Sequence, residues 1–271
     1  MGTSSSSKGP KGGVSFDPPW LDSTVSSISG ATDTIDSFVG SGEVVLAPSN
    51  RFTEARRNLS AYIRNGQTES LRHAIRSYVR NGLGGASRAA SRMKVAAAAG
   101  AKTFLLLSGT ESIERAQFKE KLTALLISEH TTEDVISAIV NFVFPSIGSV
   151  DEESCRNAMA EALSDLLLEK PDVDIVNLPE QDIWWLLELF LGKTIVKQVT
   201  FDIGQVLESD AINIDDKIRR LEEIDRFVQS VVSVSFQKVR DKNADLSQND
   251  IARIIRDAVA LTFKVFGDGN E

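Results

Sequence analysis

Few side chains in this sequence have the types and spacing that catalysis or metal binding requires. The chain contains only two histidines, His73 and His130, and neither has a second ligand at metal-binding spacing. The single cysteine, Cys155, lies beside Glu153 and Arg156 on a segment with amphipathic helical spacing. No acid–base partner for its thiol is visible, so we interpret Cys155 as an ordinary buried or half-buried residue. The sequence predicts no catalytic residue, no metal site and no cofactor.

Two glycine-containing stretches could hold an anion. The stretch "GAKT" (Gly100 to Thr103) resembles the end of a phosphate-binding loop, but glycine does not directly precede Lys102 and no strand leads into it. The stretch "GLGGAS" (Gly82 to Ser87) places backbone N–H groups before an expected helix and could form an anion-binding nest. A plain turn between two helices explains the second stretch better.

The extreme N-terminus has a chemical mechanism of its own. Small Gly2 after Met1 predicts removal of the initiator methionine, which leaves a glycine α-amine. "MGTSSS" also fits the myristoylation pattern, with Ser6 in its last position. In either case a glycine α-amine lies at the end of a long N-terminal tail, where the active site of another enzyme could modify it.

Charge is distributed unevenly along the chain. The net charge is −8, but residues 51–102 carry 11 Lys or Arg against 2 Asp or Glu. The basic block contains a stripe of arginines at helical spacing and a further pair one turn apart, and we predict that they contact an anionic partner: Arg72, Arg76, Arg80, Arg88 and Arg92. Two alternatives require no anionic partner: the arginines belong to solvated helix faces, or they pair with the acidic remainder of the chain.

Composition and cysteine content favour a globular protein of a reducing compartment. The chain has 271 residues, 42% of them hydrophobic and 25% charged. A single cysteine allows no intramolecular disulfide. The N-terminus lacks the apolar region of a secretory signal, and no run of about 18 apolar residues predicts a membrane helix. We therefore expect a cytoplasmic protein that does not insert into a membrane.

Three segments must position these residues. Residues 1–48 are rich in Ser, Gly and Pro and contain the element "DPPW" (Asp17 to Trp20), and we expect this tail to be disordered. Residues 49–110 read as a basic helical hairpin followed by an alanine-rich helix. Residues 111–271 read as an acidic helical domain.

An internal repeat predicts the hairpin. "AYIRNG" (Ala61 to Gly66) recurs as "SYVRNG" (Ser77 to Gly82), and each copy resembles a helix end with a left-handed C-cap. Thr68 is the candidate N-cap of the second helix. The buried stripe of that helix comprises Leu71, Ile75, Tyr78 and Val79.

The rest of the chain is helical by period. "TTEDVISAIVNFVF" carries a Thr/Asp cap signal and ends before Pro145, and "PEQDIWWLLELFLGKTIVKQV" starts with acidic residues after Pro179. Its tryptophans Trp184 and Trp185 fit a core or a subunit interface. Only "VDIVNL" and "TFDIGQV" could form short strands. The predicted fold class is all-α, a multi-helix bundle of eight to ten helices behind a disordered N-terminal tail.

The order and spacing of several N-terminal pieces resemble the QatB family, a component of the bacterial Qat (QatABCD) anti-phage defence system. The pieces are "MGTSSS", "GPKGG", "DPPW", "RFTEARRNLSAYIRNG" and "LRHAIRSYVRNGLGGASRAASRM", all within roughly the first 110 residues. Beyond Thr110 the resemblance carries no information.

This resemblance implies a non-enzymatic protein that works with an ATPase, a deazaguanine-synthase-like protein and a TatD-like nuclease. The deazaguanine-synthase-like partner of the family is thought to join a deazaguanine group to an N-terminal glycine amine. The matching residue here is Gly2. Pro18, Pro19 and Trp20 would then dock on a partner, since the prolines favour an extended backbone and the tryptophan offers an anchor.

Three hypotheses follow for the function. The first is a scaffold or adaptor of a defence complex whose Gly2 is modified. The second is a nucleic-acid-binding module that uses the basic face from Arg72 to Arg92, although the block has few aromatic side chains for base stacking. The third is an enzyme acting on nucleotides, for which the sequence offers no site residue. The first is preferred, and the oligomeric state is left open.

Overall fold

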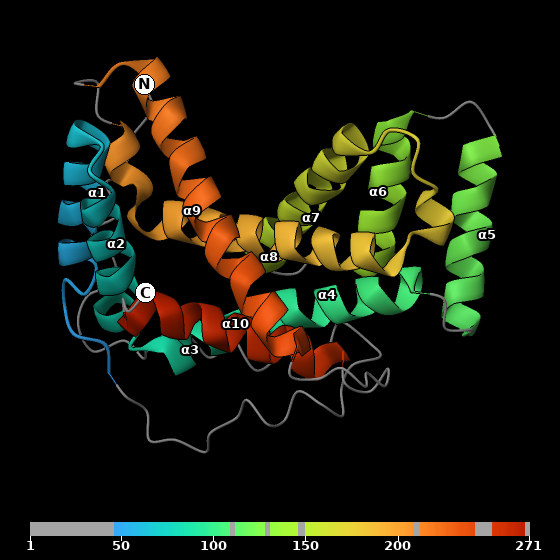
Figure 1. Ribbon diagram of the computed structural model, residues 1–271, viewed down its shortest axis with the longest axis horizontal. Coiled ribbons are helices and arrows are strands. Elements are labelled where there is room, and N and C mark those ends of the chain that lie inside the picture. The colour runs from blue at the N-terminus through green and yellow to red at the C-terminus, as the bar shows by residue number, and fades with distance from the viewer. Residues whose placement is uncertain are drawn as a thin grey trace.

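The computed structural model is an all-helical bundle (Figure 1). It describes residues 46–108, 112–127, 131–145, 150–208, 212–241 and 251–268. Within these ranges the chain forms ten α-helices and no β-strand, which confirms the predicted fold class. The α-helices are α1 (Thr53–Asn65), α2 (Thr68–Ser77), α3 (Ala86–Arg92), α4 (Lys94–Leu107), α5 (Ile113–Ile127), α6 (Thr132–Val143), α7 (Val150–Glu169), α8 (Glu180–Ile203), α9 (Ile214–Asp241) and α10 (Ile251–Asp268).

The predicted hairpin is formed by α1 and α2, which lie against each other at one end of the molecule (Figure 1). Gly66 ends α1 in the left-handed conformation, with φ of 69°, and its N–H donates to the Tyr62 carbonyl. This C-cap is the one that the first repeat copy predicts. Thr68 is the first residue of α2 rather than its N-cap, because Gln67 holds the cap position without a side-chain hydrogen bond. The predicted buried stripe of α2 is confirmed.

The second repeat copy ends differently from the first. Tyr78–Gly82 forms a π-helix, η5, instead of closing in a left-handed cap. Gly82 packs so closely that a Cβ there would lie 2.5 Å from the Phe52 ring. The left-handed turn comes later, at Gly84 and Gly85, where φ is 80° and 105°. The predicted C-cap at Asn81-Gly82 is therefore wrong, and the π-helix there packs against a residue 30 positions away.

Helices α4, α8 and α10 form the centre of the bundle. Helix α4 is buried on nearly every side, as its alanine-rich composition allows. It packs against both α8 and α10, and α9 in turn packs against α8 and α10 (Figure 1). Trp184 of α8 is fully buried, with its ring centroid 4.7 Å from that of Phe104 and 6.3 Å from that of Phe236. The core prediction for Trp184 is confirmed, while Trp185 is half-buried against the same core.

Several helix ends lie where the sequence predicts them. The two stretches that could have formed short strands do not form strands. Thr131 caps α6 through a reciprocal hydrogen-bonded box with Asp134, and α8 begins directly after Pro179. The stretch "VDIVNL" instead contains the 3-10 turn η6 (Ile175–Asn177), and "TFDIGQV" continues α8 into the 3-10 turn η7 (Gly204–Glu208). One continuous core runs through helices of both predicted helical segments, from Phe52 to Phe266.

Candidate functional site

The five arginines predicted to contact an anionic partner differ in their solvent exposure. Arg72 and Arg80 are exposed on α2 and η5. Arg76 is half-buried and donates to the backbone carbonyl of Asp268 at 3.2 Å. Arg88 is half-buried and its Nη1 lies 3.4 Å from the carbonyl oxygen of Gly84. Arg72 and Arg80 are therefore exposed, whereas Arg76 and Arg88 contact backbone carbonyl groups of the same chain.

Arg92 belongs to a buried polar cluster around Asp202. The Tyr78 hydroxyl donates to the Asp202 carboxylate at 2.8 Å, and Arg56 donates to the Asp202 backbone carbonyl at 2.9 Å. Burial raises the pKa of Asp202 above its ordinary value, although the Tyr78 hydrogen bond and the neighbouring guanidinium groups of Arg92, Arg51 and Arg56 oppose this shift. The cluster joins α1, η5 and α3 to the end of α8.

Two buried aromatic rings, those of Phe52 and Tyr78, adjoin this cluster. The guanidinium carbons of Arg51 and Arg56 lie 4.9 Å and 5.8 Å from the centroid of the Phe52 ring, which stacks on Tyr78 at 5.8 Å. Burial, and then the charge of Arg92, lower the pKa of Arg51. Sequence reasoning did not single out Asp202, because its stretch "TFDIGQV" was considered only as a possible short strand. The sequence signal that could have indicated Asp202 was an acidic residue near the end of a mostly apolar helical segment.

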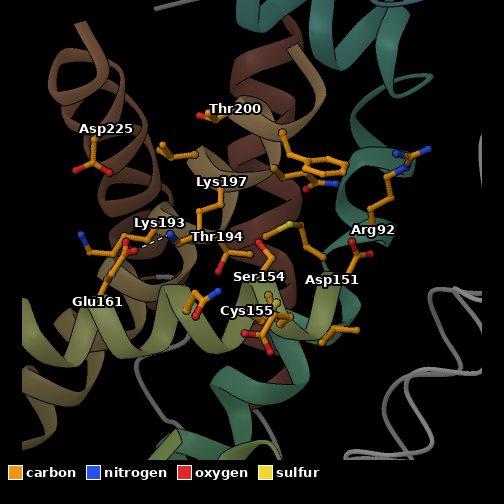
Figure 2. A pocket seen from close by; sticks show the side chains of 18 residues that line it. Arg92, Asp151, Ser154, Cys155, Glu161, Lys193, Thr194, Lys197, Thr200 and Asp225 are labelled. Atoms are coloured by element: carbon orange, nitrogen blue, oxygen red, sulfur yellow. Dashed lines mark hydrogen bonds and ion pairs between the residues drawn. The ribbon is translucent and has the colours of Figure 1, made fainter. Parts of the chain in front are cut away.

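A pocket of about 670 Å³ lies next to this cluster (Figure 2). We call it the α7/α8 pocket, since most of its lining comes from these two helices. Its apolar lining comprises Met93, Val95, Ala96, Cys155, Val196 and Phe201.

Acidic and basic side chains lie at both ends of the α7/α8 pocket. Arg92 and Asp151 lie together at one end (Figure 2), where burial raises the pKa of Asp151 and the charge of Arg92 opposes that shift. At the other end Lys197 Nζ lies 2.6 Å from Glu161 Oε1. Lys193 Nζ lies 2.7 Å from Asp165 Oδ2 on the same side.

The two groups with nucleophilic or acid–base potential are placed unfavourably for catalysis. Cys155 is buried at 4% exposure, and burial, reinforced by Asp151 and Glu152, raises the pKa of its thiol. The thiol is therefore protonated at neutral pH. His73 is exposed on α2, with Nε2 3.2 Å from Glu69 Oε1. His130 lies outside the described residues, and among the described residues no group of three His, Cys, Asp or Glu side chains could hold a metal ion.

The predicted N-terminal sites lie outside the structure described. Gly2, Pro18, Pro19 and Trp20 all precede Leu46, the first described residue. Their proposed roles in modification and docking stay predictions.

A comparison with protein-family models decides the family. Residues 84–266 match the model described as Qat anti-phage system associated protein QatB. This match covers most of the chain. The chain belongs to the QatB family. Searches of curated proteins and of solved structures found no match.

The family match places the QatB signature mainly in the helical body. It begins at Gly84, so it includes every residue that lines the α7/α8 pocket, as well as Asp202. The sequence resemblance, in contrast, depends on the first 110 residues and overlaps this match only from residue 84 onward. The identification is thus confirmed by a match that lies largely in the part of the chain where the sequence alone carried no resemblance. None of the described helices of this QatB-family protein is long and apolar enough to span a bilayer.

Proposed function

We propose that this QatB-family chain is a non-enzymatic scaffold or adaptor of an anti-phage defence complex and the substrate of a modification at Gly2. The observation that carries the proposal is the family match over residues 84–266, which makes the chain a defence-system component. The ATPase, the deazaguanine-synthase-like protein and the TatD-like nuclease are the proposed partners, and the cytoplasm is the proposed location.

The charges of the body support an adaptor role. At one end of the α7/α8 pocket, Lys197 forms an ion pair with Glu161. The thiol of Cys155 is held in its protonated form by burial. A protein with these features offers surfaces for binding rather than an activated nucleophile.

The proposed modification uses the α-amine of Gly2. After Met1 is removed, the neutral amine attacks the carboxyl carbon of a deazaguanine acid that the partner has activated with a nucleotide. An amide bond forms, the activating nucleotide leaves and the amine nitrogen loses a proton. A second residue as small as glycine allows the terminus to enter a narrow active site.

The experiment is the intact mass of this chain, co-expressed with and without the deazaguanine-synthase-like partner, followed by fragmentation of the N-terminal peptide. We expect a partner-dependent adduct on Gly2. The variant Gly2→Pro should lose both the adduct and phage protection, because proline offers only a hindered secondary amine. Gly13→Pro is the matched control and should retain both.

Two results would refute parts of this proposal. Full protection by a well-expressed Gly2→Pro variant would exclude modification at Gly2 as the working step. Turnover of a nucleotide by the purified chain, abolished by a substitution in the α7/α8 pocket, would exclude the non-enzymatic role.

A further inference from the structure

Helix α5 carries apolar side chains on two opposite sides. Phe118 and Leu122 are buried on the side where α5 packs against α6, α4 and η6. The helical period places Ile113 and Ile127 on the opposite side, where they are 82% and 81% exposed. No other large apolar side chain in the part of the chain that the structure describes is as exposed as these two. Apolar residues on both sides are typical of a helix that is covered on both sides.

The two exposed isoleucines belong to one continuous face of α5. They are 14 positions apart, which brings them within about 40° of each other around the helix axis and about 21 Å apart along it. We call this face the outer face of α5, and it comprises Ile113, Ala116, Glu120, Ala124 and Ile127. Helix α5 stands at one end of the bundle, and no other described helix lies beyond it (Figure 1).

Glu120 is the charged residue at the centre of the outer face. The residues three and four positions away from it are uncharged: Ala116, Gln117, Thr123 and Ala124. A cation on the same helix face would have to occupy one of these positions, so α5 itself offers Glu120 no partner. The carboxylate is therefore placed between two apolar contact points and is available to a cation from another chain.

The other charges near this face do not serve it. Glu114 Oε1 lies 3.1 Å from Lys102 Nζ of α4, and Lys119 Nζ donates to Asn177 Oδ1 at 3.0 Å. These contacts hold α5 against the body of the protein. Lys121 is exposed, but consecutive residues are turned by about 100° around a helix, so it lies on the flank rather than on the outer face.

We propose that the outer face of α5 binds an amphipathic helix of a partner protein. The partner helix packs apolar side chains on Ile113 and Ile127 and places a lysine or arginine opposite Glu120. Small side chains at Ala116 and Ala124 allow the two helices to approach closely on either side of this ion pair. The interface gives the proposed adaptor role a contact surface, and it rests on that role.

Charge argues for a different protein rather than a second copy of this chain. Glu120 lies midway between Ile113 and Ile127. Two outer faces paired in register therefore bring one Glu120 against the other, whether the helices run parallel or antiparallel. Two facing carboxylates repel each other, whereas a lysine or arginine at the centre of the partner helix is attracted.

The test places the photo-crosslinking residue p-benzoylphenylalanine at Gln117, an exposed position on α5 beside Glu120. The full chain is co-expressed with the three proposed partners, the ATPase, the deazaguanine-synthase-like protein and the TatD-like nuclease. We expect irradiation to capture one of them through a helix in which a lysine or arginine stands between apolar residues, identified by mass spectrometry. Lys238, exposed on α9, is the control position for the same label.

Matched variants test each part of the interface. Ile113→Ser combined with Ile127→Ser should reduce capture about tenfold or more, while Leu168→Ser, at an exposed apolar residue of α7, should not. Glu120→Lys should reduce capture by a similar factor, while Glu169→Lys should not. Changing the cation of the captured helix to glutamate should restore capture by the Glu120→Lys variant. Because all these positions are exposed, circular dichroism should show unchanged helical content.

Three results would overturn this interface. They are the absence of capture from Gln117, capture of a second copy of this chain, and capture that Glu120→Lys leaves unchanged. Capture of a partner from Lys238 but not from Gln117 would overturn the interface while leaving the adaptor role intact, so the two proposals fail separately.

Discussion

The hydroxyl of Tyr78 donates a hydrogen bond of 2.8 Å to the carboxylate of Asp202, across 124 positions of sequence. Tyr78 stands in the π-helix that ends the basic hairpin, and Asp202 stands near the end of α8. The bond therefore ties the N-terminal hairpin to the central helix of the bundle. Asp202 directly follows Phe201, an exposed residue that lines the α7/α8 pocket. The cluster and the pocket are therefore adjacent.

Removing the Tyr78 hydroxyl should destabilise the fold. Tyr78→Phe removes the hydroxyl that donates to the half-buried Asp202 carboxylate, and we expect a loss of about 1–3 kcal/mol in the free energy of unfolding, measured by urea denaturation. Tyr62→Phe is the matched control, because the Tyr62 hydroxyl donates to Glu223, which keeps Arg220 as a second partner. A larger loss for Tyr62→Phe than for Tyr78→Phe would contradict this ranking.

The raised pKa of Asp202 predicts a pH dependence with a definite sign. Since burial raises the pKa in the folded state, the folded protein holds this proton more tightly than the unfolded chain. The stabilising contribution of Asp202 is full below the ordinary aspartate pKa and is lost as pH rises through the folded value. Asp202→Asn should therefore become more stable relative to the native chain as pH rises from about 4.

Urea midpoints of the two proteins between pH 4 and pH 7 measure this difference. Asp225→Asn provides a comparison, because burial also raises the pKa of Asp225, so its relative stability should change in the same direction. Relative stability of Asp202→Asn that stays constant or falls over this range would contradict the assigned direction.

The same substitution at two glycines should have opposite effects. Gly66 has φ of 69°, and a Cβ there would lie 2.1 Å from the Arg220 side chain, so Gly66→Ala should cost about 1 kcal/mol or more. Gly100 lies inside α4, and a Cβ there would meet its nearest neighbour at an ordinary 3.5 Å. Gly100→Ala should therefore stabilise the protein by about 0.5–1 kcal/mol. Thermal unfolding of both variants decides, and destabilisation by Gly100→Ala would show that the core there has no room.

The thiol of Cys155 should be slow to react in the native protein. Burial keeps the thiol covered and protonated, so maleimide labelling has to wait for an opening of α7. We expect labelling in urea to be faster than labelling of the native protein by on the order of a hundredfold or more. Mass spectrometry measures both rates. Equal rates in the two conditions would mean that the α7/α8 pocket exposes this thiol.

The two exposed arginines of the stripe set a limit on nucleic-acid binding. If a DNA duplex binds through Arg72 and Arg80 alone, the logarithm of affinity should fall with the logarithm of salt with a slope of roughly −2. Fluorescence anisotropy measures this slope. Arg72→Ala combined with Arg80→Ala should abolish binding, while Arg57→Ala with Arg64→Ala on α1 should not. A slope near −5 would require the engaged arginines to turn outward.

Local patterns in the sequence were sufficient for most of the helices and for several of their ends. The period of Leu71, Ile75 and Tyr78 determined which face of α2 is buried, and Pro179 determined where α8 begins. These features depend on residues a few positions apart, so the sequence carries them directly. The family resemblance likewise came from the order of short N-terminal pieces.

Only the tertiary structure decided what those helices bring together. The Phe52 ring, packed on Gly82, accompanies a π-helix where the repeat predicted a cap. Arg92 shares one helical stripe with Arg88, yet it lies in the cluster around a carboxylate 110 positions away. The α7/α8 pocket exists because side chains from α3, α4, α7, α8 and α9 meet there. Contacts between distant residues depend on how whole helices pack, and no local period encodes them.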